Sequence, residues 1–94
     1  MRIVKEAVAG TLESSDLFVR VSPGDRLEVS IASTVMGQYG DQIEAVVRET
    51  LDQLGVTEAL VAVDDKGALD FAVRARVQAA VLRAAQAKPD WSVL

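Results

Sequence analysis

The first half of the fold is decided by one stretch, Gly10-Thr11-Leu12-Glu13-Ser14-Ser15-Asp16, which separates apolar runs at residues 4–9 and 17–21. Short serine and aspartate side chains favour turns because they hydrogen-bond to nearby backbone groups. The residues that follow, 17–22, alternate apolar and polar side chains with a period of two, which predicts a strand. We therefore expect a hairpin of residues 4–12 and 17–22 with Ser14 and Ser15 at its tip.

Two further strands are expected to join this hairpin in one sheet. In the first strand, Val8 and Leu12 are expected to share one face. Proline and glycine at Ser22–Asp25 predict a second turn, and residues 27–31 alternate as a third strand. These three strands predict an antiparallel meander with one apolar face, and the short apolar run at residues 59–63 predicts a fourth strand in the same sheet.

Two helices are expected to cover the apolar face. Apolar residues at helical spacing predict the first helix, which is either capped at Ser33 or Thr34 and bent near Gly40, or begins at Asp41. The second helix is predicted over residues 68–87, ending before Pro89. Its apolar stripe comprises Leu69, Val73, Val77, Ala80, Val81 and Ala84. The predicted fold class is α+β: a two-layer structure with a mainly antiparallel sheet, order β-β-β-α-β-α, and both helices on one face.

Composition limits the chemistry that this chain can perform. Its 94 residues make one small domain, and it has no cysteine and no histidine. Thiol nucleophiles and most zinc sites are therefore excluded, as is the side chain that most often transfers protons near neutral pH. We therefore do not expect an autonomous hydrolase or oxidoreductase, and any thiol chemistry needs a sulfur atom supplied from outside the polypeptide.

Charge and hydropathy limit the possible partners. The formal net charge of −4 argues against nucleic acid as a partner, because nucleic-acid binding normally needs a clustered basic surface. No apolar run is long enough to cross a membrane, and the charged start is not that of a signal peptide, so a cytoplasmic protein is expected. Residues 68–94 are mildly basic, and Arg76 and Arg83 are seven positions apart on one helical face. They form either a solvated face with ion pairs or a docking surface.

The acidic residues give no convincing catalytic or metal site. Asp64 and Asp65, with Asp25, are interpreted as solvated turn acids rather than as a cation site, because they lack the spacing of converging oxygen ligands. Glu13 and Asp16 flank the two serines, but a serine nucleophile needs a base that this turn does not supply. The two acids would repel a free phosphate, so a phosphate-bearing group at this turn would have to be attached covalently.

Several motifs resemble one known family. The stretch from Gly10 to Asp16 is similar to the prosthetic-group site of the acyl carrier proteins of citrate lyase, the γ subunits. The similarity continues in Val4-Lys5-Glu6-Ala7-Val8-Ala9-Gly10, Gln38-Tyr39-Gly40-Asp41-Gln42-Ile43, Asp64-Asp65-Lys66-Gly67-Ala68-Leu69-Asp70 and Arg74-Ala75-Arg76-Val77-Gln78-Ala79. These motifs occur in the same order over nearly the whole chain. The resemblance implies a single acyl carrier domain at residues 1–88 and a C-terminal tail at residues 89–94.

The resemblance also implies a role for Ser14. In the family, the first serine of the motif carries 2′-(5″-triphosphoribosyl)-3′-dephospho-coenzyme A through a phosphodiester, and Ser15 does not. A prosthetic-group transferase installs the group, which carries acetyl and citryl thioesters. The α subunit exchanges acetyl for citrate, and the β subunit releases oxaloacetate, so the complex converts citrate to oxaloacetate and acetate during citrate fermentation. The implied site is therefore Ser14, with no catalytic and no metal-binding residue.

Three alternatives remain at this stage. The carrier subunit of malonate decarboxylase uses the same kind of cofactor, although the Gly10–Asp16 stretch favours citrate lyase. An unmodified domain that scaffolds an enzyme complex is a second alternative. An ordinary phosphopantetheine carrier is a third, and the strands predicted on both sides of Ser14 argue against it, because in that fold the modified serine begins a helix.

Overall fold

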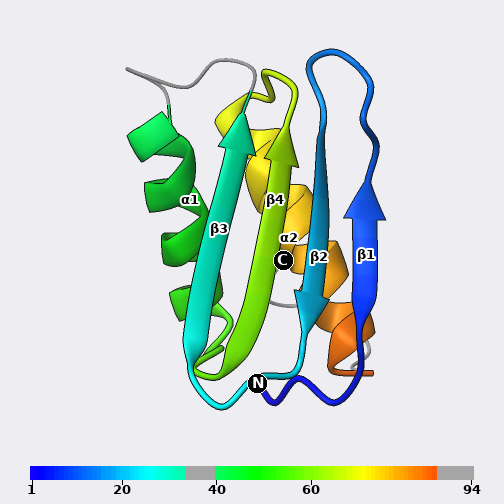
Figure 1. Ribbon diagram of the computed structural model, residues 1–94, viewed down its shortest axis with the longest axis vertical. Helices are drawn as coiled ribbons and strands as arrows, with labels where there is room; N and C mark the ends of the chain where they lie inside the picture. The colour runs from blue at the N-terminus through cyan, green and yellow to red at the C-terminus, as the bar shows by residue number, and fades with distance from the viewer. Residues whose placement is uncertain (34–39, 87–94) are drawn as a thin grey trace.

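The computed structural model describes residues 1–33 and 40–86. Figure 1 shows how the strands and helices of these residues are arranged. They are β1 (Ala7–Gly10), β2 (Leu17–Ser22), β3 (Leu27–Ser33), α1 (Gly40–Gln53), β4 (Ala59–Asp65) and α2 (Asp70–Ala84). The α+β class and the β-β-β-α-β-α order are those predicted from the sequence. No helix in the described ranges is both long and apolar enough to span a membrane.

The strands are arranged in the order β1-β2-β4-β3. As predicted, β1 pairs with β2 as an antiparallel hairpin. The predicted meander is wrong, because β4 lies between β2 and β3. It runs antiparallel to β2, with Val63 opposite Val19, and parallel to β3, with Val61 beside Val29. The alternation of apolar residues predicts which face of a strand is buried, but not which strand lies next to it.

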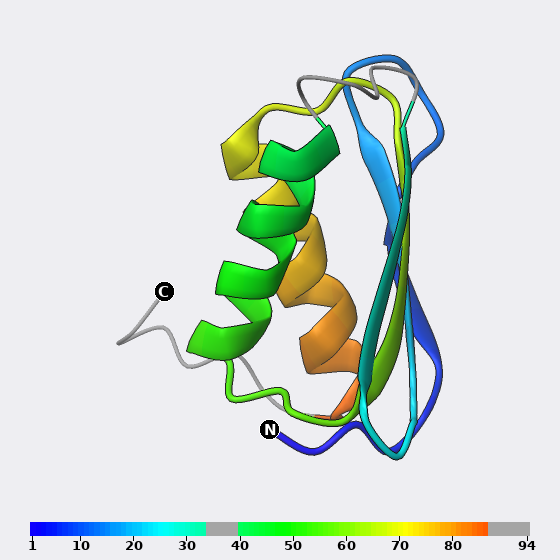
Figure 2. The same ribbon diagram turned by 60° about the vertical axis from the view of Figure 1, so that its left-hand side comes forward.

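Both helices lie on one face of the sheet, as Figure 2 shows and as the sequence predicts. Helix α2 packs on β1 and β2, and α1 packs on β3 and α2. The core is filled by alternate residues of the strands and by the inner helix faces. Its fully buried large side chains include Leu17, Val19, Val21, Val47, Leu51, Val73, Val77 and Val81. Burying one such side chain stabilises the fold by about 2 kcal/mol.

The first strand buries the small Ala9 and exposes the larger Val8. Val8 is 40% exposed and Leu12 is 59% exposed, whereas Ala9 is buried. The cause is the hairpin register, in which Ala9 lies opposite the buried Val19 and therefore faces the helices. The strand is also shorter than predicted, because the backbone amides of residues 4 and 5 both donate to the carbonyl of Ala84 at the end of α2.

The ends of the other elements differ modestly from the prediction. Ser33 is the last residue of β3 and not a helix cap, and α1 begins at Gly40. Whether a helical segment precedes Gly40 lies outside the described residues, as does the proposed cap at Thr34. Helix α2 occupies residues 70–84 of the predicted 68–87, and its predicted stripe is buried except for Leu69. Pro89 and the predicted tail at residues 89–94 also lie outside the described residues.

Candidate functional site

The candidate site is the loop of residues 11–16, which joins β1 to β2 at the upper end of the molecule in Figure 1. Its tip is a tight turn in which the Asp16 amide donates to the Glu13 carbonyl at 3.2 Å. Ser14 and Ser15 are the two central residues of this turn. Ser15 has φ 65°, a left-handed conformation that is unusual for a residue other than glycine. The two serines therefore differ in backbone geometry although they are adjacent.

Asp16 fixes the base of the turn. Its carboxylate accepts hydrogen bonds from the Arg76 guanidinium at 3.1 Å (Nε) and 2.9 Å (Nη2), from the Thr11 hydroxyl at 2.6 Å, and from the Leu17 amide at 2.8 Å. These bonds, with Arg76 as the largest contributor, lower the pKa of Asp16 from 3.8 to about 2. Since Arg76 belongs to α2, the carboxylate ties the hairpin tip to a helix 60 positions later in the sequence.

The same loop is also held by the connection between β4 and α2. The Ser15 amide donates to the Lys66 carbonyl at 2.8 Å, and the Lys66 amide donates to the Asp16 carbonyl at 2.9 Å. This pair of backbone bonds resembles one more step of an antiparallel ladder. The backbone of Ser15 is therefore fixed by the β4–α2 connection, and Ser14 lies in a turn whose base is held in place.

The β4–α2 connection is in turn held by Asp65. This carboxylate is fully buried and accepts hydrogen bonds from the Ser33 hydroxyl at 2.8 Å and from the amides of Gly67 at 3.1 Å and Ala68 at 2.9 Å. The interpretation of Asp65 as a solvated turn acid is wrong. A buried carboxylate is tolerated because several donors satisfy its oxygens. Its neighbour Asp64 is partly exposed, as predicted, and pairs with Lys66 at 3.3 Å.

Gly10 allows the loop to leave β1. It has φ 95°, and a Cβ atom at this position would lie 1.9 Å from the carbonyl oxygen of Leu17. The Thr11 amide donates to that same carbonyl at 3.1 Å, which closes the loop. Only glycine fits this close approach, so the first residue of the motif has a structural role.

Both serine hydroxyls at the tip are exposed. Within residues 1–33 and 40–86, neither hydroxyl makes a hydrogen bond, and no group of side chains there could hold a metal ion. Of the two acids that flank the serines, Asp16 is already engaged by Arg76, and the Glu13 carboxylate makes no hydrogen bond to either hydroxyl within the described residues, so neither acid is placed as a base. An exposed and unactivated hydroxyl on a protruding turn fits an attachment point that an external enzyme modifies. It does not fit a nucleophile that acts in catalysis.

The two arginines considered for partner docking make internal contacts instead. Arg76 pairs with Asp16, and Arg83 donates to the carbonyl of Val8 at 2.8 Å. Both side chains therefore fasten the β1–β2 hairpin to α2, which corresponds to the ion-paired alternative rather than to a free docking face. Sequence reasoning missed these contacts and those of Asp65, because the partners are far apart in the chain and nothing local marks them.

The chain is similar to known proteins over nearly its whole length. Residues 4–84 match the family model described as malonate decarboxylase delta subunit (MdcD). The citrate lyase acyl carrier protein of Albidiferax ferrireducens is 60% identical, over 100% of this chain and 99% of that protein. The citrate lyase acyl carrier protein of Enterobacter sp. (strain 638) is 58% identical, over 98% of this chain and 97% of that protein.

A solved structure has the same fold. It is a chain of a Pseudomonas malonate decarboxylase hetero-tetramer in complex with malonate, with a TM-score of 0.71, 23% sequence identity, and coverage of 88% of this chain and 91% of that one. The relatives are named as acyl carriers, and the full-length identities of 58% and 60% are to carriers of citrate lyase. The chain described here therefore belongs to the family of citrate lyase acyl carrier proteins.

Proposed function

We propose that this chain is the carrier subunit of a citrate lyase and that Ser14 is the residue to which 2′-(5″-triphosphoribosyl)-3′-dephospho-coenzyme A is attached by a phosphodiester. The observation that carries the proposal is the exposed Ser14 hydroxyl on a turn whose base is held by Asp16, Lys66 and Arg76. The attached group would supply a thiol, which carries acyl groups as thioesters and which this cysteine-free chain lacks.

The residues around Ser14 suit a covalent attachment. The negative charge of Asp16 is compensated by Arg76, so Glu13 is the flanking acid that remains uncompensated among the described residues. Among the described residues, the basic side chain bonded to this loop is Arg76, and its guanidinium is occupied by the Asp16 carboxylate, which favours a covalent link over a pocket for free phosphate. Because the base of the turn is fixed, the reach of a carrier must come from the length of the attached group rather than from movement of the loop.

The proposed partners are the α and β subunits of citrate lyase and the transferase that modifies Ser14. The enzymes would catalyse acyl exchange and cleavage of citrate to oxaloacetate and acetate, while this chain contributes no catalytic residue. Tethering an acyl group to the complex raises its effective concentration to about the millimolar range. The cytoplasm, where such a fermentation complex works, is the proposed location. The related malonate decarboxylase carrier is the nearest second candidate, because the family model bears that description.

Mass spectrometry of the protein from its own citrate-fermenting cells tests the proposal. We expect an adduct with the mass of the phosphoribosyl dephospho-coenzyme A group on the peptide that contains Ser14. The adduct should be absent from Ser14→Ala and retained in Ser15→Ala, which serves as the matched control. Retention in Ser14→Ala and loss in Ser15→Ala would assign the site to the other serine. An unmodified wild-type chain in such cells would leave the scaffold alternative.

A further inference from the structure

Exposed apolar side chains are concentrated at the end of the molecule that bears Ser14. Among the described residues, the three most exposed large apolar side chains are Leu12 at 59%, Leu69 at 65% and Phe71 at 71%. The other exposed ones, Met1, Val4, Val8 and Leu60, range from 40% to 49%. An apolar side chain that stays exposed to water contributes little to the free energy of folding. A largely exposed aromatic side chain often marks an interaction surface.

These three residues belong to two segments that are bonded to each other. Leu12 lies in the 11–16 loop, two positions before Ser14, and Leu69 and Phe71 lie at the start of α2. Figures 1 and 2 both show that loop and the first turn of α2 at the same end of the molecule. The backbone bonds between Lys66 and residues 15 and 16 connect the two segments. A protein that reaches Ser14 therefore approaches this end.

Leucine at position 69 does not stabilise the start of α2. It occupies the N-cap position, with φ −79° and ψ 160°, and makes no capping hydrogen bond with its side chain. Serine, threonine, asparagine and aspartate are strongly preferred at this position because their side chains accept a hydrogen bond from the first turn. A leucine that neither caps the helix nor enters the core is better explained by a contact outside this chain.

The surroundings of the three apolar residues are acidic. Glu13 follows Leu12, and Asp41 and Asp70 lie in the first turns of α1 and α2, which start at this same end (Figure 2). None of these three acids forms an ion pair within the described residues, and Asp70 instead accepts a hydrogen bond from Gln42 at 3.3 Å. A complementary partner surface is therefore apolar at its centre and basic at its border.

We infer that Leu12, Leu69 and Phe71 form the docking surface for the citrate lyase enzyme assembly, which binds it through an apolar patch bordered by lysine or arginine. This inference rests on the proposed function, because it takes the partner to be the enzyme that acts on the group at Ser14. The surface is distinct from Ser14 itself, so it is used whether or not the chain is modified. Contact at this surface would bring the attachment point to the partner in a fixed orientation.

Binding to the purified α and β subunits, measured by calorimetry, tests the inference. We expect Phe71→Ser to weaken binding by about thirtyfold and Leu69→Ser by about tenfold, as for a buried interface anchor. Leu69→Ser should at the same time raise the melting temperature by about 4 °C, because serine caps α2. A purely structural role for Leu69 cannot move stability and binding in these opposite directions. Leu60→Ser, on a different part of the surface, is the matched control and should change binding by less than about twofold.

The possible outcomes separate the docking surface from the proposed function. If the wild-type chain binds the subunits and the Leu69 and Phe71 variants bind equally well, the docking surface is wrong and the carrier function stands. If the wild-type chain does not bind them at all, the carrier function fails, and the docking surface fails with it. If the wild-type chain forms a dimer that Phe71→Ser abolishes, a second copy covers the patch, which also overturns the inference. Ser14→Ala should bind like the unmodified wild-type chain.

Discussion

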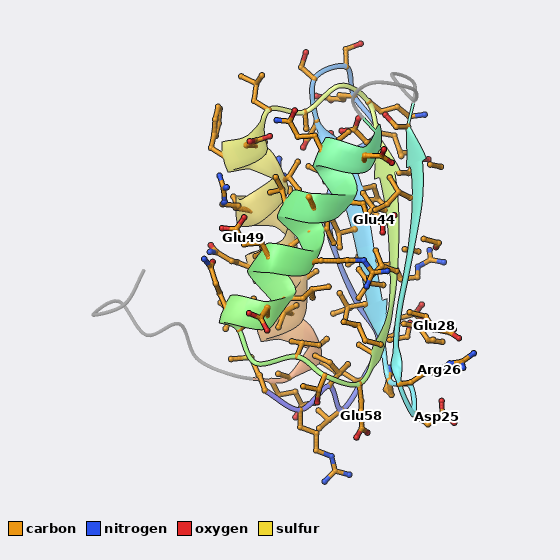
Figure 3. All side chains as sticks on the ribbon, turned by 90° about the vertical axis from the view of Figure 1, so that its left-hand side faces the viewer. Asp25, Arg26, Glu28, Glu44, Glu49 and Glu58 are labelled. Atoms are coloured by element: carbon orange, nitrogen blue, oxygen red, sulfur yellow. The ribbon has the colours of Figure 1, made fainter. Side chains whose placement is uncertain are left out.

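The two loops at opposite ends of β2 are similar in composition but differ in the bonds that hold them. Both are short and rich in turn-forming residues, but the loop at residues 11–16 is held by a carboxylate, an arginine and a neighbouring loop. In the connection at residues 23–26, the described contacts are one backbone bond from Ala59 to the Arg26 carbonyl and an ion pair between Arg26 and Glu28. Figure 3 shows Arg26 and Glu28 exposed at the end of the sheet away from the 11–16 loop.

The loop at residues 11–16 holds Ser14 in a defined position, whereas the connection at residues 23–26 only joins two strands. The connection at residues 23–26 is positioned by the strands it joins. The 11–16 loop needs additional bonds, because a hydroxyl on a protruding turn has a defined position only if the turn does. We therefore expect substitutions in the two loops to differ widely in their cost.

The largest effect is expected at Gly10. Gly10→Ala should lower the free energy of unfolding by on the order of 4 kcal/mol, because the new Cβ would meet the Leu17 carbonyl oxygen and the residue already has φ 95°. Urea unfolding measures the change. Gly67→Ala is the matched control, since Gly67 has φ 93° with no atom within 4 Å of the added Cβ, and it should cost only about 1 kcal/mol. Equal costs would show that the carbonyl contact relaxes without penalty.

A smaller effect is expected at Asp65. Asp65→Asn should lower the free energy of unfolding by about 2 kcal/mol, because the amide cannot accept from all three donors that the carboxylate satisfies. The adjacent Asp64→Asn should change it by less than about 0.5 kcal/mol, since Asp64 forms only a partly exposed pair with Lys66. Amide hydrogen exchange of Gly67 and Ala68 should increase in the first variant alone. Unchanged exchange there would show that Asp65 does not hold the β4–α2 connection.

The Asp16–Arg76 pair should make a pH-dependent contribution. Asp16→Asn is expected to cost about 1 kcal/mol at neutral pH, a value reduced by the partial exposure of Arg76. The pKa of Asp16 is lowered from 3.8 to about 2, so its contribution is fully present above about pH 4 and is lost as the pH falls toward 2. Unfolding curves of wild type and Asp16→Asn should therefore converge in that range. Glu13→Gln, at an exposed position, is the control, and a difference that persists below pH 2 would contradict the assignment.

The smallest effect is expected in the loop at residues 23–26. Arg26→Ala removes an ion pair whose side chains are 78% and 50% exposed, so the free energy of unfolding should change by less than about 0.5 kcal/mol. Thermal unfolding at low and high salt measures it. A loss close to that of Asp16→Asn would remove the distinction between the two loops.

Much of the fold could be predicted from local patterns. The hairpin, the two helices and the placement of both helices on one face follow from the periods of the apolar residues. The insertion of β4 between β2 and β3 could not, because parallel pairing across a helix has no local signal. The buried face of β1 could not be predicted, because its inward residue, Ala9, is smaller than the outward Val8 and the hairpin register decides which of them faces the helices.

The position of the site could be predicted from the sequence, but the hydrogen bonds and ion pairs that hold it could not. The serine and aspartate content of residues 13–16 was sufficient to predict an exposed turn. The sequence did not distinguish Asp16 and Asp65, which hold loops in place, from Asp64, which is a partly exposed surface acid, because all three were expected to lie in solvated turns. Only the fold brings Arg76 to Asp16 and Ser33 to Asp65. The assignment of Ser14 rather than Ser15 remains a prediction that comes from the family resemblance.

The long-range bonds of the loop have a consequence for biosynthesis. The hairpin of β1 and β2 is complete early in the chain, but Lys66 and Arg76, which hold its tip, are translated much later. A nascent or truncated chain therefore has the serine without the turn geometry that the folded domain gives it. If Ser14 is modified as proposed, an enzyme that recognises the shape of this turn would modify finished domains and leave incomplete ones unmodified.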